Sequence, residues 1–124
     1  IFPTSTPAQV ADTLADCRPR VAIVDTAAQL EKVLAALGRA AALGEPLAGA
    51  LRVVVCGDAR AAHAAASGCS ARDAGVRVAA WDEWLAAGET RLGDLAMAKA
   101  VDARVADATG DRLAGLIYPS GSTG

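Results

Sequence analysis

Aromatic side chains are scarce in this sequence of 124 residues, which contains two Trp, one Tyr and one Phe. Its core must therefore be built from Ala, Val, Leu and Ile, and 53% of the residues are hydrophobic. Charged residues make up 21%, so the composition excludes a disordered, highly charged tail. A chain of this length is sufficient for one domain that buries about two thirds of its unfolded surface.

An excess of charge of one sign is also lacking. The formal net charge is −2 at pH 7, and no basic stripe of the kind that contacts a phosphate backbone is present, so we expect no nucleic-acid partner. No run of about 18 strongly apolar residues occurs, and the Ala-rich run 35–43 is broken by Gly38 and Arg39. We expect no transmembrane segment and a cytoplasmic location, with peripheral membrane association left open.

Cysteine and histidine do not show the spacing of a zinc site. Cys17, Cys56 and Cys69 form no C-x-x-C pair, and His63 is the single histidine, so we expect no zinc site. We interpret the cysteines as reduced thiols, with Cys56 buried in a strand. His63 has no recognisable partner and is interpreted as a surface or packed side chain.

The sequence does contain a regular alternation of strand and helix signals. Short apolar runs rich in β-branched residues predict buried strands, and capping residues followed by spaced apolar residues predict helices. This alternation predicts an α/β fold, a largely parallel sheet with helices on both faces, in a single partial domain over residues 1–124. The predicted strands are 20–25, 51–58, 76–81 and 112–120.

Helix starts and stops are marked by specific residues. Thr6, Pro7 and Gln9 form a capping-box pattern, and Thr26 begins a helix with Leu30, Val33, Leu34 and Leu37 on one face. Residues 59–67 and 82–89 are predicted helices, and 92–106 favours helix. Gly38, residues 43–46 and Gly88 are predicted breakers, and 67–75 is a predicted loop. Trp81 and Trp84, three residues apart, are expected to anchor the core.

Polar residues lie at the ends of the predicted strands. Asp25 and Asp58 are the last residues of the predicted strands 20–25 and 51–58, and the loop 119–124 lies at the end of the last predicted strand. Ligands of parallel sheets bind beyond the carboxyl ends of the strands, so these segments are the first places to look for a site. Aspartates at such positions more often form turns and cap helices.

The loop Tyr118-Pro119-Ser120-Gly121-Ser122-Thr123-Gly124 has the composition of an anion site. Glycines let the backbone approach a ligand closely, and successive N–H groups with Ser and Thr hydroxyls can surround phosphate oxygens. The loop is not a Walker A sequence, which requires a lysine, and it is not a G-x-G-x-x-G fingerprint.

The stretch "LIYPSGSTG" resembles the phosphate loop of the adenylate-forming (AMP-binding) superfamily, Y-[TS]-S-G-[TS]-T-G-x-P-K-G, and matches six of the seven core positions present. Asp111 and Ala114 fit the lead-in to that loop. The opening "IFPTSTPAQVADTLADCRPRVAIVD" resembles a segment of long-chain fatty acyl-CoA synthetases, and "VAAWDEWLAAGE" resembles their W-x-E-L-x-x-x-G segment. The similarity is collinear and spans nearly the whole chain.

This resemblance implies an N-terminal-domain fragment of an ATP-dependent fatty acid–CoA ligase. The parent enzyme would form an acyl-adenylate from ATP and a carboxylate with Mg²⁺ present, release pyrophosphate, and pass the acyl group to coenzyme A. The ATP phosphates would be held by Ser120, Gly121, Ser122, Thr123 and Gly124. No catalytic or metal-binding residue of this chain is implied, and the fragment alone is expected to be inactive.

The chain departs from the family pattern in two places. Pro119 stands where the family has Thr or Ser, which removes a hydroxyl and a backbone N–H and fixes φ. If these groups contact phosphate, the loss of each weakens binding by roughly 1–3 kcal/mol. The x-P-K-G that completes the family motif is not among these 124 residues, and whether the natural product continues into it is left open.

Two further hypotheses stay open. The first is a non-catalytic α/β binding module, in which Pro119 marks a loop that has lost its role. The second lies within the superfamily and is an adenylation domain of a carboxylic acid reductase, fatty acyl-AMP ligase or peptide synthetase. A receiver-like signalling domain is set aside because the last predicted strand ends without the required lysine. In each case an unpaired sheet edge would favour self-association.

Overall fold

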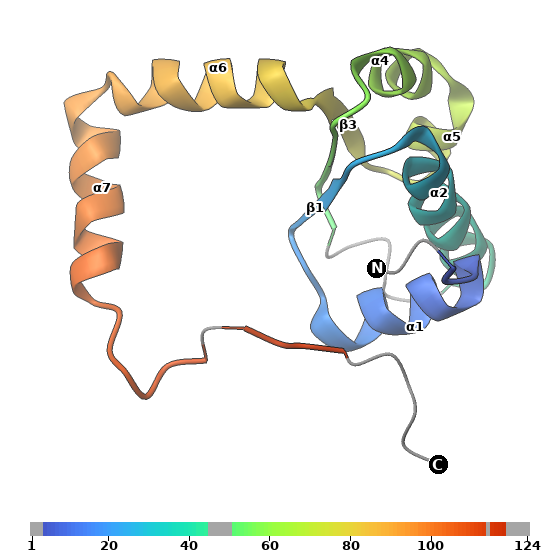
Figure 1. Ribbon diagram of the computed structural model, residues 1–124, viewed down its shortest axis with the longest axis horizontal. Coiled ribbons are helices and arrows are strands. Elements are labelled where there is room, and N and C mark those ends of the chain that lie inside the picture. The colour runs from blue at the N-terminus through green and yellow to red at the C-terminus, as the bar shows by residue number, and fades with distance from the viewer. Residues whose placement is uncertain (1–3, 45–50, 114, 119–124) are drawn as a thin grey trace. The chain divides into compact units, whose positions relative to one another are not determined.

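A computed structural model describes residues 4–44, 51–113 and 115–118 (Figure 1). The chain divides into two compact units, Ile1–Gly88 and Glu89–Gly124, and each is described by itself. The expected phosphate-binding residues 120–124, together with Pro119, lie outside the described residues.

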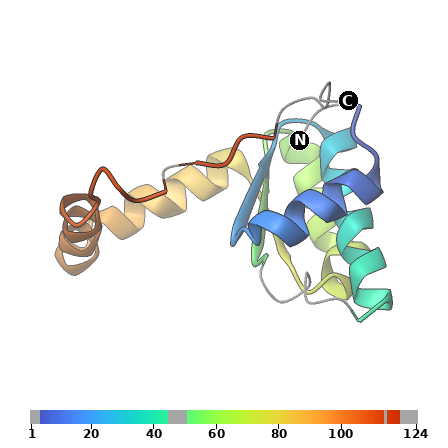
Figure 2. The same cartoon turned by 90° about the horizontal axis from the view of Figure 1, so that it is seen from below.

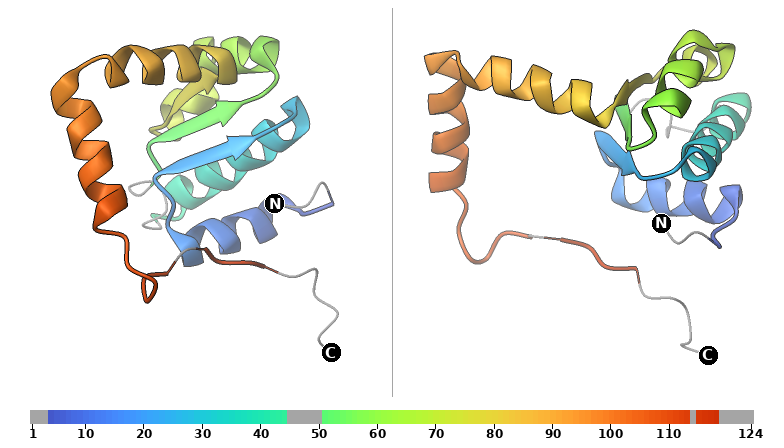
Figure 3. Two further views of the ribbon diagram at one scale, coloured as in Figure 1. Left: turned by 60° about the vertical axis from the view of Figure 1, so that its left-hand side comes forward. Right: turned by 45° about the horizontal axis from the view of Figure 1, so that its top comes forward.

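The first unit is built on a three-stranded parallel sheet in the order β1-β2-β3. The strands are β1 (Val21–Val24), β2 (Val53–Cys56) and β3 (Arg77–Ala80). The register aligns Val24 with Cys56 and Cys56 with Ala80, so the three strands end at the same level. Figure 3 shows them pointing in the same direction. The prediction of an α/β fold with a parallel sheet is confirmed.

Helices connect and precede these strands, and the predicted caps are present. Thr6 and Gln9 form a complete capping box at the start of α1 (Pro7–Cys17), and Thr26 and Gln29 form another at α2 (Ala27–Ala42). Each box satisfies N–H groups that a helix start leaves unpaired. The remaining helices of this unit are α4 (Ala59–Ser67), α5 (Cys69–Asp73) and the start of α6 (Trp81–Leu92).

The core lies between one face of the sheet and these helices. Alternate strand residues point into it, and the apolar stripe of α2 packs over them. The strand contribution is Ala22, Val24, Val54, Cys56, Val78 and Ala80, and the stripe of α2 contributes Leu30, Val33, Leu34 and Leu37. All four of these predicted α2 residues are buried, as expected.

The two faces of the sheet are covered differently: α1, α2, α4 and α5 contribute to the core on one face, and α6 places Trp84 beside Arg77 of the other face. The core helices lie on one side of the sheet (Figure 2). On the other face Val21 is 39% exposed and Ile23 is 63% exposed, whereas Val55 and Ala79, in register with Ile23, are buried. Both crossovers advance in the same direction, from β1 to β2 and from β2 to β3. Crossovers of one hand that advance in one direction place their helices on the same face.

Three local predictions, two helix ends and one loop, are wrong. Gly38 and Gly88 do not end helices, because α2 continues to Ala42 and α6 to Leu92. An internal glycine destabilises a helix by only about 1 kcal/mol, and the burial of Leu37 and Ala40 outweighs this in α2. The predicted loop 67–75 contains the short helix α5.

The second unit contains the rest of α6 and α7 (Leu95–Ala106), whose start is capped by Asp94 through a 2.8 Å hydrogen bond from the Ala96 N–H. The strand predicted over 112–120 is wrong for its described residues, 112–113 and 115–118, which belong to no strand. Leu113 is 77% exposed and Ile117 is 92% exposed. An apolar run becomes a strand only when a neighbouring strand accepts its backbone hydrogen bonds. No described helix combines the length and apolar character needed to cross a bilayer.

Candidate functional site

The carboxyl edge of the sheet brings together residues from the ends of all three strands. Because Val24, Cys56 and Ala80 are aligned, the residues that follow them emerge side by side. These following residues are Asp25, Gly57 and Trp81. The sequence placed Asp25 and Asp58 at this edge, and the structure confirms that placement.

Gly57 sits in contact with Asp25. Its N–H donates a 2.9 Å hydrogen bond to the Val24 carbonyl, which extends the β1–β2 ladder by one residue. A Cβ atom at position 57 would lie 2.9 Å from the Asp25 carbonyl oxygen and 3.1 Å from Asp25 Oδ1. Only glycine fits here without moving the backbone, so this position fixes the distance between the two strand ends.

The two aspartates have different roles. Asp58 Oδ1 accepts a 2.9 Å hydrogen bond from the Ala61 N–H and is the N-cap of α4. The Asp25 N–H donates to Gln29 Oε1 at 2.9 Å, whereas its carboxylate accepts no hydrogen bond within the described part of the chain. Asp58 is therefore a helix cap, as aspartates at strand ends commonly are, and the Asp25 carboxylate is available to a ligand.

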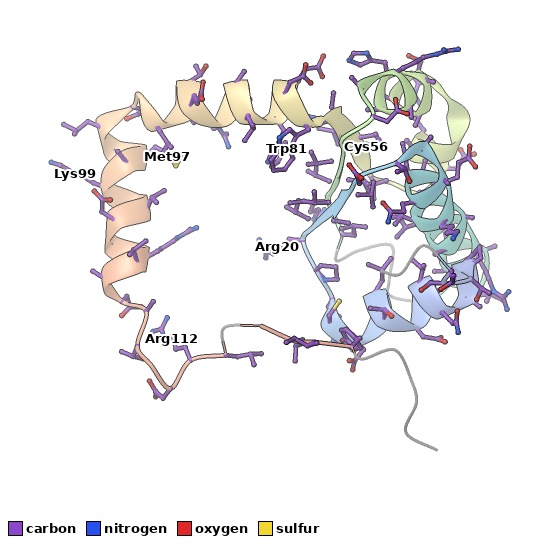
Figure 4. All side chains as sticks on the ribbon, in the orientation of Figure 1. Arg20, Cys56, Trp81, Met97, Lys99 and Arg112 are labelled. Carbon is purple, nitrogen blue, oxygen red and sulfur yellow. The ribbon has the colours of Figure 1, made fainter. Side chains whose placement is uncertain are left out.

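Cys56, labelled in Figure 4, is the last residue of β2 at this edge, and its side chain is fully buried. Burial raises the pKa of this thiol above its ordinary value, and the negative charges of Asp58 and Asp25 raise it further, against a lowering hydrogen bond from the Asp58 backbone. The thiol is therefore protonated at neutral pH. A protonated, inaccessible sulfur is not a nucleophile.

A pocket of about 350 Å³ opens at this edge. It is lined by Ile23, Val24, Asp25, Gly57 and Trp81, all from the first unit. Trp81 was expected to anchor the core, but it is 42% exposed, and Trp84 is half-buried with the Arg77 guanidinium 6.0 Å from its ring centroid. The expected anchoring role is wrong for both, because α6 follows β3 without a turn and leaves the core side of the sheet.

His63 has a partner that the sequence did not reveal. Its Nε2 lies 2.9 Å from Glu83 Oε1, which joins α4 to the first turn of α6. The two residues are 20 positions apart, so no local pattern could have identified the pair. Both side chains are about 60% exposed, and ion pairs this exposed contribute little to stability.

Metal ligands do not gather in the described residues, where no three His, Cys, Asp or Glu side chains come together around a common point. The chemistry available at the carboxyl edge is therefore that of one free carboxylate, one indole ring and an apolar floor.

Comparison with known proteins adds no relative. No family model, curated protein or solved structure matches this chain. The resemblance of its loop and flanking segments to adenylate-forming enzymes stays a prediction.

Proposed function

We propose that this chain is part of the N-terminal domain of an ATP-dependent fatty acid–CoA ligase and supplies its phosphate loop. The observation that carries the proposal is the sequence Ser120-Gly121-Ser122-Thr123-Gly124, which has the backbone freedom and hydroxyl donors of a polyphosphate site. In this proposal the parent enzyme uses ATP, Mg²⁺ and coenzyme A in the cytoplasm. The 124 residues alone form no acyl-adenylate.

The parallel α/β architecture of the first unit supports the proposal at the level of fold class. Such sheets carry ligands beyond the carboxyl ends of their strands. Fold class alone does not imply activity, so the loop carries the functional argument.

A non-catalytic binding module is the second candidate. The pocket at the carboxyl edge favours it, because the described residues that line this pocket all belong to the first unit. The buried, protonated Cys56 and the exposed His63–Glu83 pair provide no nucleophile with an activating base.

Nucleotide binding by the loop is tested by NMR on the ¹⁵N-labelled chain, titrated with Mg²⁺–ATP and with pyrophosphate. We expect the amide signals of residues 120–124 to shift, and Gly121→Val to abolish the shift because its side chain blocks close approach of the phosphate. Pro119→Thr restores a hydroxyl and an N–H and is expected to tighten binding about fivefold or more. Ser5→Ala, outside the loop, is the matched control and should change nothing.

The native transcript is then sequenced beyond Gly124. Continuation through x-Pro-Lys-Gly, with ATP–pyrophosphate exchange that depends on a fatty acid in the complete product, supports the ligase. Absence of amide shifts at millimolar ATP, with no such continuation, removes the ligase and leaves the binding module.

A further inference from the structure

The pocket at the carboxyl edge has a size and lining suited to a small ligand. Its volume of about 350 Å³ falls near the lower end for small-molecule sites. Ile23 supplies an apolar wall, Gly57 contributes no side chain, and Trp81 supplies an aromatic ring. Two further cavities lie against α2, and the described residues that line them include no aromatic side chain.

The charge at this edge is negative. The exposed carboxylate of Asp25 lines the pocket, and Asp58 adds a second carboxylate from the neighbouring strand end. The N-termini of α2 and α4 lie nearby, and each carries a partial positive charge of about half a unit. Thr26 and Asp58 already cap them, so the two full negative charges outweigh the helix ends.

The aromatic and apolar parts of the pocket also favour a cationic ligand. The face of a Trp ring attracts cations more strongly than other aromatic rings do, and Trp81 is partly exposed. No Lys or Arg is among the described lining residues, so none of these residues competes for the Asp25 carboxylate. An apolar wall such as Ile23 suits an aliphatic stem and lowers the local dielectric, which strengthens an ion pair.

We propose that this pocket binds an organic cation, a guanidinium or ammonium group on a short aliphatic stem, between the Asp25 carboxylate and the Trp81 ring. The cation pairs with Asp25, the stem packs on Ile23, and the indole face covers the charged group. This inference is independent of the proposed ligase function, which concerns an anionic ligand at residues 120–124.

The test uses butylguanidinium as the probe and butylurea as its neutral near-isostere. Binding to the ¹⁵N-labelled chain is followed through the Gly57 amide and the Trp81 indole N–H signals. We expect butylguanidinium to shift both signals, butylurea to bind about tenfold more weakly or not at all, and salt to weaken the charged probe. Asp25→Asn and Trp81→Leu should each weaken butylguanidinium about fivefold or more, measured at Gly57.

Asp58→Asn is the matched control. It removes a carboxylate from the same edge but keeps the helix cap, since Asn caps as well as Asp. The proposal predicts less than about a twofold change for this variant, because Asp58 does not line the pocket. Circular dichroism confirms that each variant is folded.

Three results would overturn the proposal: equal binding of butylurea and butylguanidinium, equal weakening by Asp25→Asn and Asp58→Asn, or no shift at Gly57 with tens of millimolar probe. Shifts at Gly57 caused by pyrophosphate in preference to the cation would also overturn it, whatever residues 120–124 do. If butylguanidinium binds, its affinity is then compared with that of a blocked Gly-Arg-Gly peptide. Tighter binding of the peptide would indicate that the natural ligand is an arginine side chain of a protein. Tighter binding of butylguanidinium would indicate a free small molecule. Either result supports the proposal that the pocket binds an organic cation.

Discussion

At the scale of single residues, the close approach of Gly57 to Asp25 predicts that a side chain at position 57 destabilises the fold. In Gly57→Ala the new Cβ would lie 2.9 Å from the Asp25 carbonyl oxygen, a backbone atom that cannot turn away. The strand ends must therefore move apart, and we expect the free energy of unfolding to fall by roughly 1–3 kcal/mol. Urea denaturation followed by circular dichroism measures the change.

Gly38→Ala is the control for this variant. Gly38 lies inside α2, and a methyl group at this position would meet no atom within 4 Å, so alanine adds helix propensity without a clash. We expect Gly38→Ala to stabilise the protein by roughly 0.5–1 kcal/mol. Equal effects of the two substitutions would contradict the close approach of Gly57 to Asp25.

The raised pKa of Cys56 predicts that the stability of the fold decreases at alkaline pH. Its pKa is raised in the folded state by burial and then by Asp58 and Asp25, so folding favours the protonated thiol. The unfolded chain loses this proton first, and stability is fully present below the ordinary thiol pKa of about 8.5 and falls as pH rises above it. Urea midpoints measured on either side of that pH test the sign.

Cys56→Ala isolates this contribution. The variant lowers stability at every pH by leaving a cavity, but it should lose the part of the alkaline decline that belongs to the thiol. Cys17→Ala is the comparison, since Cys17 is only half-buried. An unchanged alkaline slope in Cys56→Ala would show that other groups cause the decline.

At the scale of secondary structure elements, the start of α2 is held by its cap. The Gln29 N–H donates to Thr26 Oγ1, and Gln29 Oε1 accepts from the Thr26 and Asp25 N–H groups. Thr26→Ala should lower the free energy of unfolding by about 0.5–2 kcal/mol. Chemical denaturation gives the value.

Thr13→Ala makes the same chemical change inside α1. Thr13 Oγ1 bonds back to the Gln9 carbonyl at 3.0 Å, and alanine is the better helix former, so we expect no loss of stability. If both Thr→Ala variants lose stability equally, the effect is not one of capping.

The helix caps and the apolar stripes were predictable because both are local. Thr6, Thr26 and the four leucine and valine positions of α2 follow from residues within one or two helical turns. Local patterns do not show the burial that keeps α2 helical beyond Gly38. They also do not show whether a neighbouring strand is available to the described residues of 112–118, and these residues form no strand. Both depend on what the rest of the chain places nearby.

The candidate site was predictable in part for the same reason. A parallel sheet with aligned strand ends places Asp25 and Asp58 at one edge, and this follows from the strand assignments. The contact of Gly57 with Asp25 and the presence of Trp81 in the pocket depend on the register and on the direction in which α6 leaves β3. A glycine immediately after a buried strand was the one sequence signal of a close approach.

At the scale of the whole molecule, the first unit has a sheet face away from the core that is buried at Val55 and Ala79 but exposed along the edge strand β1. Ile23 is 63% exposed on this face, and β1 is an edge strand whose outer backbone groups face no described strand. Exposed apolar faces and free edges favour association between copies. We expect this chain to self-associate as its concentration rises, as measured by sedimentation velocity.

Ile23→Lys tests whether this face is responsible. The substitution puts a charge on the exposed strand face, where it should disfavour association without disturbing the core, because Ile23 points away from it. Ala41→Lys, on the exposed surface of the last turn of α2, adds the same charge elsewhere and serves as the control. A sedimentation coefficient that becomes independent of concentration in Ile23→Lys but not in Ala41→Lys identifies the open face as the contact. A wild-type chain that stays monomeric at every concentration would refute the expectation, and equal effects of the two lysines would attribute association to net charge.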